Sequence, residues 1–395
     1  MIHQCSCRQS EGANRDQIHN SRAFTTMSGL ALSLCLLIAF SSSLDAQTAT
    51  EGRNLDAFIR GQMTERRIPG MQLAVIRNGR IEKIGAYGYA SLNFDVKVQP
   101  STLFSVASIS KSFTSVAIMM LVEAKKLHLD DSIGQYFPDL PESWRAIPLR
   151  RLLNHTSGLP DVAVDQYTTN TIADTANGAL KLLRERPMDF TPGADSRYNQ
   201  TNYMLLGMLV EKLSGQPFVE FCTKNMFEPF GVKTAAFGDS RAIIRNRATV
   251  YTPFRYGAGR PVQLDHYEVL NYEFPAMSYP FDGLNISITD FAAWMTALLD
   301  GKIIGQASLD EIWQPARLKD GSTPERPPTP SIWRSYGLGW VLKSDDSHPL
   351  AGGTGGIRAA FFVYPKDRLA VIVLTNAQGT RPESLADDIA HLYLR

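Results

Sequence analysis

Ser108 and Lys111 place a hydroxyl and an amine three residues apart in the segment Ser-Ile-Ser-Lys. On a helix, positions i and i+3 share a face, so the two side chains would lie next to each other. A helix N-terminus at Ser108 would favour negative charge on its oxygen. A lysine whose proton affinity is lowered by burial can take the hydroxyl proton. The spacing therefore fits nucleophilic catalysis by a serine.

Taken alone, the pair has an equally simple structural explanation. Ser-x-x-Lys is expected roughly once by chance in a chain of this length at ordinary residue usage. A serine at the start of a helix, followed by a solvated lysine, would produce the same pattern. The neighbouring segments must therefore decide between the two interpretations.

The elements that would hold these residues can be outlined from hydrophobic patterns. Residues 108–126 predict a helix rich in Val, Ala, Ile, Met and Leu, and residues 51–67 predict another. The run MQLAVIRNGRIEKIGAYGYA predicts two strands joined at Asn78-Gly79, because Asn-Gly accepts positive φ at both turn positions. Near the C-terminus, AAFFVYP and LAVIVLTN predict two more strands joined by Lys366-Asp367-Arg368, followed by a last helix in SLADDIAHLYLR.

The middle of the chain is mostly helical in pattern. Residues 170–230 include MLLGMLVEKLSG, a helix that Gly215 would terminate. HLDDSIGQYFPDLPE predicts a helical turn and a loop, and residues 231–275 are expected to be irregular. ITDFAAWMTALLDGK predicts a further helix, with Thr289 or Asp290 as its N-cap.

This order of elements predicts an α/β protein of the α+β type. Strands from both ends of the chain would form one antiparallel sheet flanked by helices, with a largely helical second subdomain between them. We expect a leader at residues 1–46 and one domain at 47–395. Within that domain, the sheet subdomain would comprise about 47–140 and 280–395, and the helical subdomain about 141–279.

Several segments in the same order resemble one family. The chain contains FSVASISKSFTS, LLNHTSGL, PGADSRYNQTNYMLLGMLVEKLSG, MFEPFGVKTAAF, YGLGW and PKDRLAVIVLTN. They resemble segments of the serine β-lactamase and penicillin-binding-protein family, which includes class C β-lactamases, DD-peptidases and related esterases. The resemblance runs from about Pro69 to Asn376 and implies a β-lactamase/transpeptidase-like fold without a cofactor.

The resemblance implies roles for individual residues. Ser108 matches the serine that is acylated, and Lys111 matches the lysine that helps to take its proton. Tyr198 matches the tyrosine of Tyr-x-Asn, a general base in acylation and a proton donor to the leaving group. Without these neighbours, Tyr198 would be interpreted as a half-buried aromatic residue before a helix. The oxyanion hole would use the backbone N–H groups of Ser108 and Gly353.

Two departures from the family pattern affect substrate binding. Gln200 replaces the asparagine of Tyr-x-Asn, so an amide remains with a longer reach. Leu350-Ala351-Gly352 replaces Lys-Thr-Gly or His-x-Gly, so the cationic or hydrogen-bonding side chain is missing. His348, on the same strand face two residues earlier, or Arg358 could supply a substitute. The expected substrate-binding residues are Gln200, Gly352, His348 and Arg358.

Other chemically suggestive residues have structural interpretations. His155 could be taken for a triad base, but in this family the HTSGL segment shapes a loop, so we expect a structural histidine. Cys222 lies in the apolar stretch FVEFC, which is typical of a core residue. Gly238-Asp239-Ser240 is interpreted as a turn. An unrelated α/β-hydrolase is disfavoured because the sequence has no Gly-x-Ser-x-Gly motif.

Charge and composition exclude several classes of partner. The formal net charge of the 395 residues is +1, and no basic run suggests nucleic acid. The seven histidines show neither His-x-His nor His-Glu-x-x-His spacing, so no metal site is expected. The expected partner is a small-molecule or peptide substrate, while the oligomeric state stays open.

The N-terminus predicts export. Residues 30–40, LALSLCLLIAF, are too few to span a bilayer, which needs about 20 apolar residues. They suit a signal peptide that follows Arg22 and is cleaved after Ala46, with translation starting at Met1 or Met27. A buried helix or a lipoprotein anchor at Cys35 are the alternatives. The mature chain would be periplasmic or secreted, without a stable membrane span.

Two functional hypotheses follow. The first is a serine hydrolase that forms an acyl-enzyme at Ser108 and hydrolyses an ester, amide or β-lactam bond. Leu350 favours an esterase or a D-amino-acid amidase or peptidase within this class. The second is a catalytically weak binding or regulatory protein on the same scaffold, which Leu350 also favours. Ser108, Lys111 and Tyr198 together argue against the second hypothesis.

Overall fold

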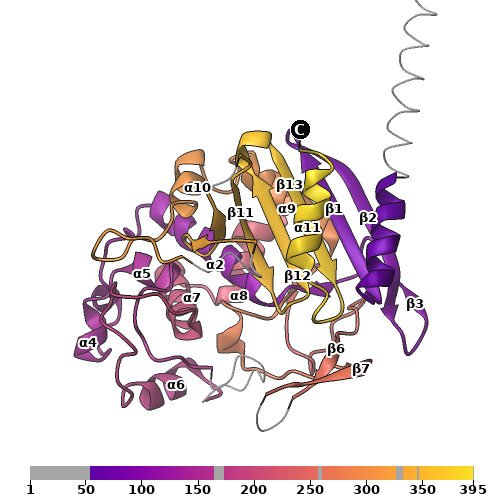
Figure 1. Ribbon diagram of the computed structural model, residues 1–395. Coiled ribbons are helices and arrows are strands. Elements are labelled where there is room, and N and C mark those ends of the chain that lie inside the picture. The colour runs from indigo at the N-terminus through magenta and orange to yellow at the C-terminus, as the bar shows by residue number, and fades with distance from the viewer. Residues whose placement is uncertain (1–53, 164–172, 257–259, 326–331, 345–346, 395) are drawn as a thin grey trace, which may run out of the picture. The chain divides into compact units, whose positions relative to one another are not determined.

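Eight antiparallel strands form the main sheet, in the order β3-β2-β1-β13-β12-β11-β10-β9 (Figure 1). A computed structural model describes residues 54–163, 173–256, 260–325, 332–344 and 347–394. The first three strands are β1 (Gly70–Arg77), β2 (Arg80–Ser91) and β3 (Val96–Lys97). The others are β9 (Ser335–Tyr336), β10 (Val341–Lys343), β11 (Leu350–Gly355), β12 (Ala359–Tyr364) and β13 (Leu369–Thr375). The prediction of one antiparallel sheet built from two distant parts of the chain is confirmed.

Helices cover both faces of this sheet. The terminal helix α11 (Pro382–His391) packs on β12 and β13, and α9 (Ile288–Leu299) packs on β1, β2 and β13 from the opposite side (Figure 1). Every residue of β12 and β13 is consequently buried. Two covered faces explain why these strands are continuous apolar runs rather than alternating ones.

Two predicted hairpins are present. Asn78 and Gly79 have φ values of 51° and 74°, so the β1–β2 turn uses positive φ at both positions. The β12–β13 connection is a 3₁₀ turn, η5 (Pro365–Asp367), followed by Arg368 at φ 50°. Both turns bring their strands into antiparallel register, with β1 paired to β13 along its length.

Helix α2 (Ser110–Glu123) runs through the core and follows the 3₁₀ turn η1 (Ala107–Ile109). The predicted helix over 108–126 therefore starts as a tighter turn and ends three residues early. Helix α7 (Gln200–Ser214) begins at Asn199, whose side chain accepts from the backbone of Asn202, and ends at Gly215 with φ 73°. The predicted glycine cap of this helix is confirmed.

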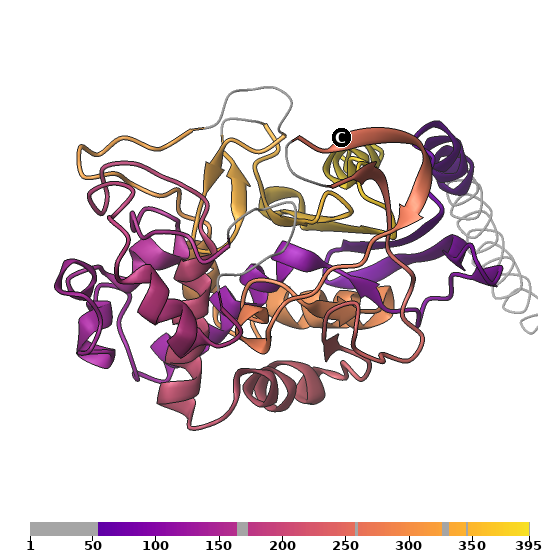
Figure 2. The ribbon, with the colours of Figure 1, turned by 90° about the horizontal axis from the view of Figure 1, so that it is seen from below.

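The remaining helices gather mainly beside the β9–β11 end of the sheet (Figures 1 and 2). Residues 54–65 are also helical. The others are α3 (Ile133–Tyr136), α4 (Glu142–Arg145), α5 (Leu149–Leu153), α6 (Ala176–Leu183), α8 (Phe218–Cys222), the π-helical turn η2 (Thr223–Phe227), η3 (Glu228–Phe230), η4 (Ala276–Ser278) and α10 (Gln306–Ile312).

One expectation about the middle of the chain was wrong. Residues 231–275 are not irregular throughout, because β6 (Tyr251–Arg255) and β7 (Val262–Val269) form a hairpin. Three short strands, β4 (Phe104–Ser105), β5 (Ala236–Phe237) and β8 (Leu284–Ile286), form a second small sheet.

The N-cap of α9 is Ser287, whereas Thr289 or Asp290 was expected. The Ser287 hydroxyl accepts from the backbone N–H of Asp290 at 3.2 Å. The Asp290 carboxylate is engaged elsewhere, since it accepts from the backbone of Lys233 and from both donors of Thr234. Asp290, which the local sequence had suggested as the cap, therefore binds Lys233 and Thr234, which are more than 50 residues away in the chain.

The described chain divides into two compact units, one ending at Ile59 and one spanning Arg60–Arg395. Within the second unit a continuous hydrophobic core joins residues of the sheet, such as Ile372, to residues of the helical part, such as Leu205. The expected subdomain boundaries at 140 and 280 stay predictions. The expected leader at residues 1–46 lies outside the described residues, and none of the described helices could cross a membrane.

Candidate active site

A sharp turn presents Ser108 at the start of α2. Ala107 has φ 48°, a left-handed conformation that costs an alanine on the order of 1 kcal/mol. The Ser110 hydroxyl donates to the carbonyl of Ala107 at 2.7 Å and holds the turn closed. Ala107 and Ile109 are buried, whereas Ser108 between them is half-buried. This turn therefore leaves Ser108 partly accessible while Ala107 and Ile109 on either side stay buried in the core.

The amine of Lys111 lies 3.2 Å from the hydroxyl oxygen of Ser108 and donates to the carbonyl of Phe281 at 3.0 Å. Only 1% of Lys111 is exposed, and its amine also faces the Tyr198 ring at 4.7 Å. Burial lowers the pKa of Lys111 to about 7, although the carboxylates of Asp282 and Asp161 partly oppose this shift. About half of the Lys111 amines are therefore unprotonated near neutral pH and able to accept a proton.

Tyr198 joins this pair from the residues that precede α7. Its phenol is hydrogen-bonded to the Ser108 hydroxyl. Burial, with Tyr336 nearby, raises the pKa of Tyr198 well above its usual value of 10. The phenol thus keeps its proton at neutral pH in this state of the site. The structure brings together the three side chains that the sequence analysis had selected: a hydroxyl, an amine and a phenol.

The imidazole ring of His155 packs against the ring of Tyr198. The two rings lie 4.5 Å apart between centroids, and His155 itself adopts φ 62° in the loop after α5. Its Nδ1 atom lies 3.2 Å from both the backbone nitrogen of Asn199 and the side-chain nitrogen of Asn202. These contacts tie the imidazole to the beginning of α7, so His155 positions Tyr198.

Two further tyrosines, Tyr336 and Tyr203, lie next to His155 and Tyr198, and the sequence analysis gave them no role. Tyr336 lies on β9, with its ring 6.4 Å from Tyr198 and 4.9 Å from His155. Tyr203, one turn into α7, donates to the carbonyl of Leu153 at 2.7 Å. Tyr336 belongs to the YGLGW segment, so its position in a motif was the available signal.

Two carboxylates were also missed, Asp161 and Asp282. Asp161 accepts from the backbone N–H of Gln200 at 2.9 Å and of Ala163 at 3.2 Å. Asp282 accepts from the backbone of Gly283 at 2.6 Å and directly follows the residue whose carbonyl binds Lys111. Burial raises the pKa of both carboxyl groups. Single aspartates in loops carry no periodic signal, which explains why the sequence did not reveal them.

Glycines on β11 allow that strand to approach the nucleophile. A Cβ at Gly355 would lie 2.0 Å from the carbonyl oxygen of Val106, and one at Gly353 would lie 3.1 Å from the hydroxyl of Ser112 on α2. Only a strand without side chains at these positions can press against η1 and α2. Gly352, also on β11, pairs with Val341 of the neighbouring strand β10. The assignment of Gly353 as an oxyanion donor stays a prediction.

Arg358, one of the two candidates for the missing cation, is enclosed by other side chains. The side chain is only 4% exposed and donates to the hydroxyl of Ser105 at 3.0 Å, while its guanidinium lies 5.4 Å from the centre of the Tyr272 ring. These contacts place it behind the nucleophile turn, so the geometry argues against its predicted substrate-binding role.

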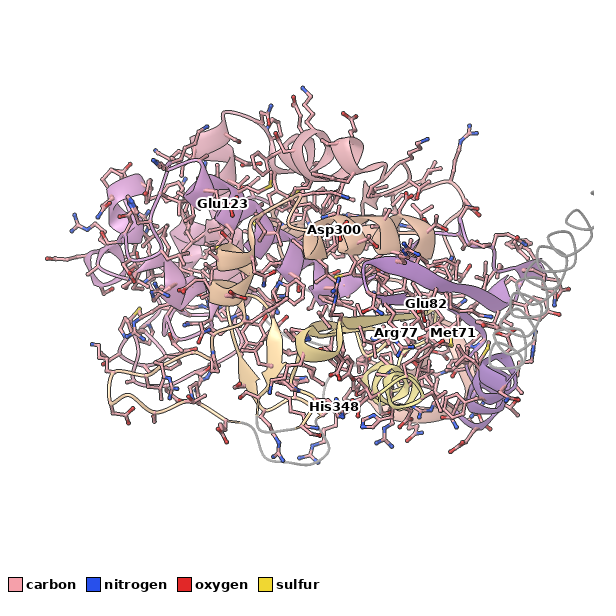
Figure 3. All side chains as sticks on the ribbon, turned by 90° about the horizontal axis from the view of Figure 1, so that it is seen from above. Met71, Arg77, Glu82, Glu123, Asp300 and His348 are labelled. Carbon is pink, nitrogen blue, oxygen red and sulfur yellow. The ribbon has the colours of Figure 1, made fainter. Side chains whose placement is uncertain are left out.

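His348 is held away from the site as well. Its Nδ1 atom lies 3.0 Å from both carboxylate oxygens of Asp367 in the β12–β13 turn. That turn lies beyond the Leu350 end of β11, whereas the Gly355 end of the strand contacts η1. Figure 3 shows His348 near the rim of the molecule. This position does not support the predicted substrate contact.

Gln200, a predicted substrate-binding residue, has a side-chain oxygen that accepts no hydrogen bond from the described residues. It is the first residue of α7, and its backbone N–H is taken by Asp161. Its side-chain oxygen is buried and has no hydrogen-bond partner within the described part of the chain. An amide acceptor of this kind, two residues from Tyr198, can receive a donor from a bound molecule.

Known proteins are similar to this chain over most of its length. A family model described as Beta-lactamase matches residues 55–394. Penicillin-binding protein 4* of Bacillus subtilis (strain 168) is 29% identical over 311 residues, which are 74% of this chain and 65% of that protein. The chain spans about 65% of the length of the curated relatives it matches.

Solved structures share the fold. D-amino acid amidase from Ochrobactrum anthropi SV3, complexed with D-phenylalanine, superimposes with a TM-score of 0.70 at 25% identity, covering 85% of this chain and 99% of the amidase. EstCE1, a hydrolase with promiscuous acyltransferase activity, gives a TM-score of 0.71 at 20% identity, covering 88% and 99%. The similarity to EstCE1 concerns the fold alone.

Proposed function

This chain belongs to the Beta-lactamase family, and on that premise we propose that it is a serine hydrolase that forms an acyl-enzyme at Ser108. The observation that carries the proposal is the buried Lys111 amine, 3.2 Å from the Ser108 hydroxyl and with a pKa of about 7. An amine with this pKa can serve as a base near neutral pH, which an ordinary surface lysine cannot.

In the acylation step, the Ser108 oxygen attacks the substrate carbonyl carbon while its proton moves to the Lys111 amine. Charge develops on the carbonyl oxygen, where the N–H groups of Ser108 and Gly353 would stabilise it. Tyr198 is protonated at the start, so it can donate its proton to the leaving oxygen or nitrogen. The bond from the carbonyl carbon to the leaving group breaks as that group takes the proton, the alcohol or amine departs, and the Lys111 ammonium returns its proton to the Tyr198 phenolate.

In the deacylation step, water attacks the same carbonyl carbon and one of its protons passes to the Lys111 amine, which is unprotonated again after acylation. The bond from carbon to the Ser108 oxygen breaks, and the serine recovers its proton from the same group. The products are a free carboxylic acid and the resting enzyme. Every step uses side chains whose contacts in the resting state are already in place, so little rearrangement is required.

Within this class, we favour an ester or amide as substrate. The position that carries lysine or histidine in the family is Leu350, which is buried on β11. A substrate carboxylate, as in penicillins and peptides ending in D-Ala-D-Ala, would find no cation at that position. The similarity to a D-amino acid amidase adds support for an amide.

We also propose that the mature chain begins after Ala46 and acts in the periplasm or outside the cell, because LALSLCLLIAF suits a cleaved signal peptide. Expression of the full chain, followed by N-terminal sequencing of the exported protein, tests this. A start at Gln47 is expected, whereas an intact leader on cytoplasmic protein would contradict export.

Covalent labelling tests the hydrolase proposal. The purified protein is incubated with a fluorophosphonate probe and, separately, with fluorescent penicillin, and the labelled peptide is mapped. We expect the fluorophosphonate on Ser108 of the wild type, little penicillin labelling, and neither label in Ser108→Ala. Ser322→Ala, in an exposed turn, serves as the control. Absence of fluorophosphonate labelling in a folded wild type would overturn the proposal and favour a binding protein on this scaffold.

A further inference from the structure

The cationic side chains near the nucleophile, Lys111 and Arg358, already bind groups of the protein itself. Lys111 is buried against Ser108 and the Phe281 carbonyl. Arg358 is bound to Ser105 and to the carbonyl of Gly356 behind the turn. The neighbouring strand contributes Leu350, which is apolar and buried. An anionic group on a substrate would therefore lose its hydration without gaining a counter-ion at these residues.

Negative charge, in contrast, flanks the site on two sides. Asp282 is fixed next to Phe281, the residue that binds Lys111, and Asp161 is fixed on the backbone of Gln200 at the start of α7. Both carboxylates act electrostatically on the Lys111 amine and on the Tyr198 phenol. Both are half-buried, so neither is sealed in the core.

The two carboxylates are also incompletely neutralised. Within the described part of the chain, the hydrogen bonds to Asp161 come from backbone N–H groups. Asp282 accepts from Gly283, with Arg358 and Lys111 acting on it electrostatically. Desolvation raises the pKa of each, which means that burial is not fully compensated by the protein. A cation bound next to either carboxylate would supply the missing compensation.

A third acceptor lies in the same region. The side-chain oxygen of Gln200 is buried and, among the described residues, has no hydrogen-bond partner. An ammonium group has three donors and no acceptor, so it can donate both to this amide oxygen and to a neighbouring carboxylate. A carboxylate or a neutral methyl group in the same place would leave these acceptors unpaired.

We propose that the site selects substrates whose acyl part carries a primary ammonium group close to the scissile carbonyl, with Asp282, Asp161 and Gln200 as its recognition residues. The inference rests on the proposed serine hydrolase function and adds its substrate class. Amides or esters of amino acids with a free amine have this chemistry, whereas substrates recognised through a carboxylate do not.

Competition kinetics test the inference with three ligands of nearly equal size. Hydrolysis of p-nitrophenyl isobutyrate at pH 7 is measured in the presence of alaninamide, isobutyramide or the monoamide of methylmalonic acid, which carry an ammonium, a methyl and a carboxylate group. Both enantiomers of alaninamide are used, and the amine is largely protonated at this pH. We expect one enantiomer to compete at least tenfold better than isobutyramide, and the carboxylate to compete worst.

Variants assign the preference to the acidic residues. Asp282→Asn, Asp161→Asn and the double variant should each reduce the ratio of alaninamide to isobutyramide competition at least threefold. Asp300→Asn is the control, because it removes an equal charge at the end of α9, where Asp300 pairs with Lys302 (Figure 3). Both ligands are compared on the same enzyme, so a change in the protonation of Lys111, which alters the hydrolysis rate, cancels from the ratio.

The outcomes separate this inference from the function on which it rests. Ester hydrolysis that depends on Ser108, together with equal competition by the three ligands or strongest competition by the carboxylate, would overturn the inference alone. Equal ratios in the wild type and the double variant would do the same. No Ser108-dependent hydrolysis of the ester would instead overturn the hydrolase proposal. A preference for the ammonium that falls in the double variant supports both.

Discussion

Lys111 is the residue whose environment most differs from that of a free side chain. Its amine is enclosed by rings, by a main-chain carbonyl and by the Ser108 hydroxyl, and these groups solvate a charged ammonium less well than water does. Nearby carboxylates limit the effect without cancelling it. The result is a base whose working range coincides with neutral pH.

Activity should therefore fall as the pH is lowered through about 7. The unprotonated amine is the active form, and it predominates above its pKa of about 7 and disappears below it. A plot of kcat/KM against pH for a neutral ester should rise about tenfold per pH unit on its acidic side and level off above 7.

Asp282→Asn provides a matched test of this assignment. Because the Asp282 carboxylate raises the pKa of Lys111, its removal should move the midpoint of the rise to a lower pH, while Asp300→Asn should leave it in place. A profile that is flat between pH 5 and 8 in the wild type would refute Lys111 as the base.

At the scale of secondary-structure elements, the site depends on the contact between β11 and the turn η1. Gly355 touches the carbonyl of Val106 and the backbone nitrogen of Ile109, so the strand has no room for a side chain there. The turn carries the strained Ala107 and, next to it, Ser108. Displacement of the strand would thus move the nucleophile and the main-chain donors together.

Gly355→Ala should disrupt this contact. The added Cβ would lie 2.0 Å from the Val106 oxygen, and backbone cannot yield as a flexible side chain can. We expect a loss of about 1–3 kcal/mol in the free energy of unfolding, measured by urea denaturation, and at least a hundredfold loss of kcat/KM.

Gly61→Ala is the control for this prediction. Gly61 lies in the helical residues 54–65, and an added Cβ there has nothing within 4 Å. Alanine is the better helix former, so this variant should keep its activity and gain about 0.5–1 kcal/mol of stability. Unchanged stability and activity in Gly355→Ala would show that β11 does not press on the nucleophile turn as described.

At the scale of the whole molecule, sequence reasoning succeeded where the signal is local. Asn78-Gly79 forms the predicted hairpin turn, and Gly215 ends α7, because each requires a positive φ that few residues adopt readily. Ser108 and Lys111 are near each other for a similar reason, since their spacing on a helical turn brings them together.

Sequence reasoning was less informative where a side chain binds a segment far away in the chain. Asp290 does not cap α9, because Thr234 engages its carboxylate. Arg358 looks available in the sequence, yet Ser105 and Tyr272 enclose it in the fold. Asp282 acts on Lys111 because its neighbour Phe281 accepts a hydrogen bond from that lysine, 170 residues earlier in the chain, and no spacing rule can detect such a contact.

The central claim is that Ser108 becomes acylated during turnover, and mass spectrometry of the quenched reaction tests it most directly. The wild type is mixed with p-nitrophenyl isobutyrate, quenched in acid within milliseconds to seconds, and digested. The account predicts one isobutyryl group on the peptide that contains Ser108, transient in the wild type and absent in Ser108→Ala. Turnover of the ester by Ser108→Ala at the wild-type rate, or an acyl group on another residue, would contradict it.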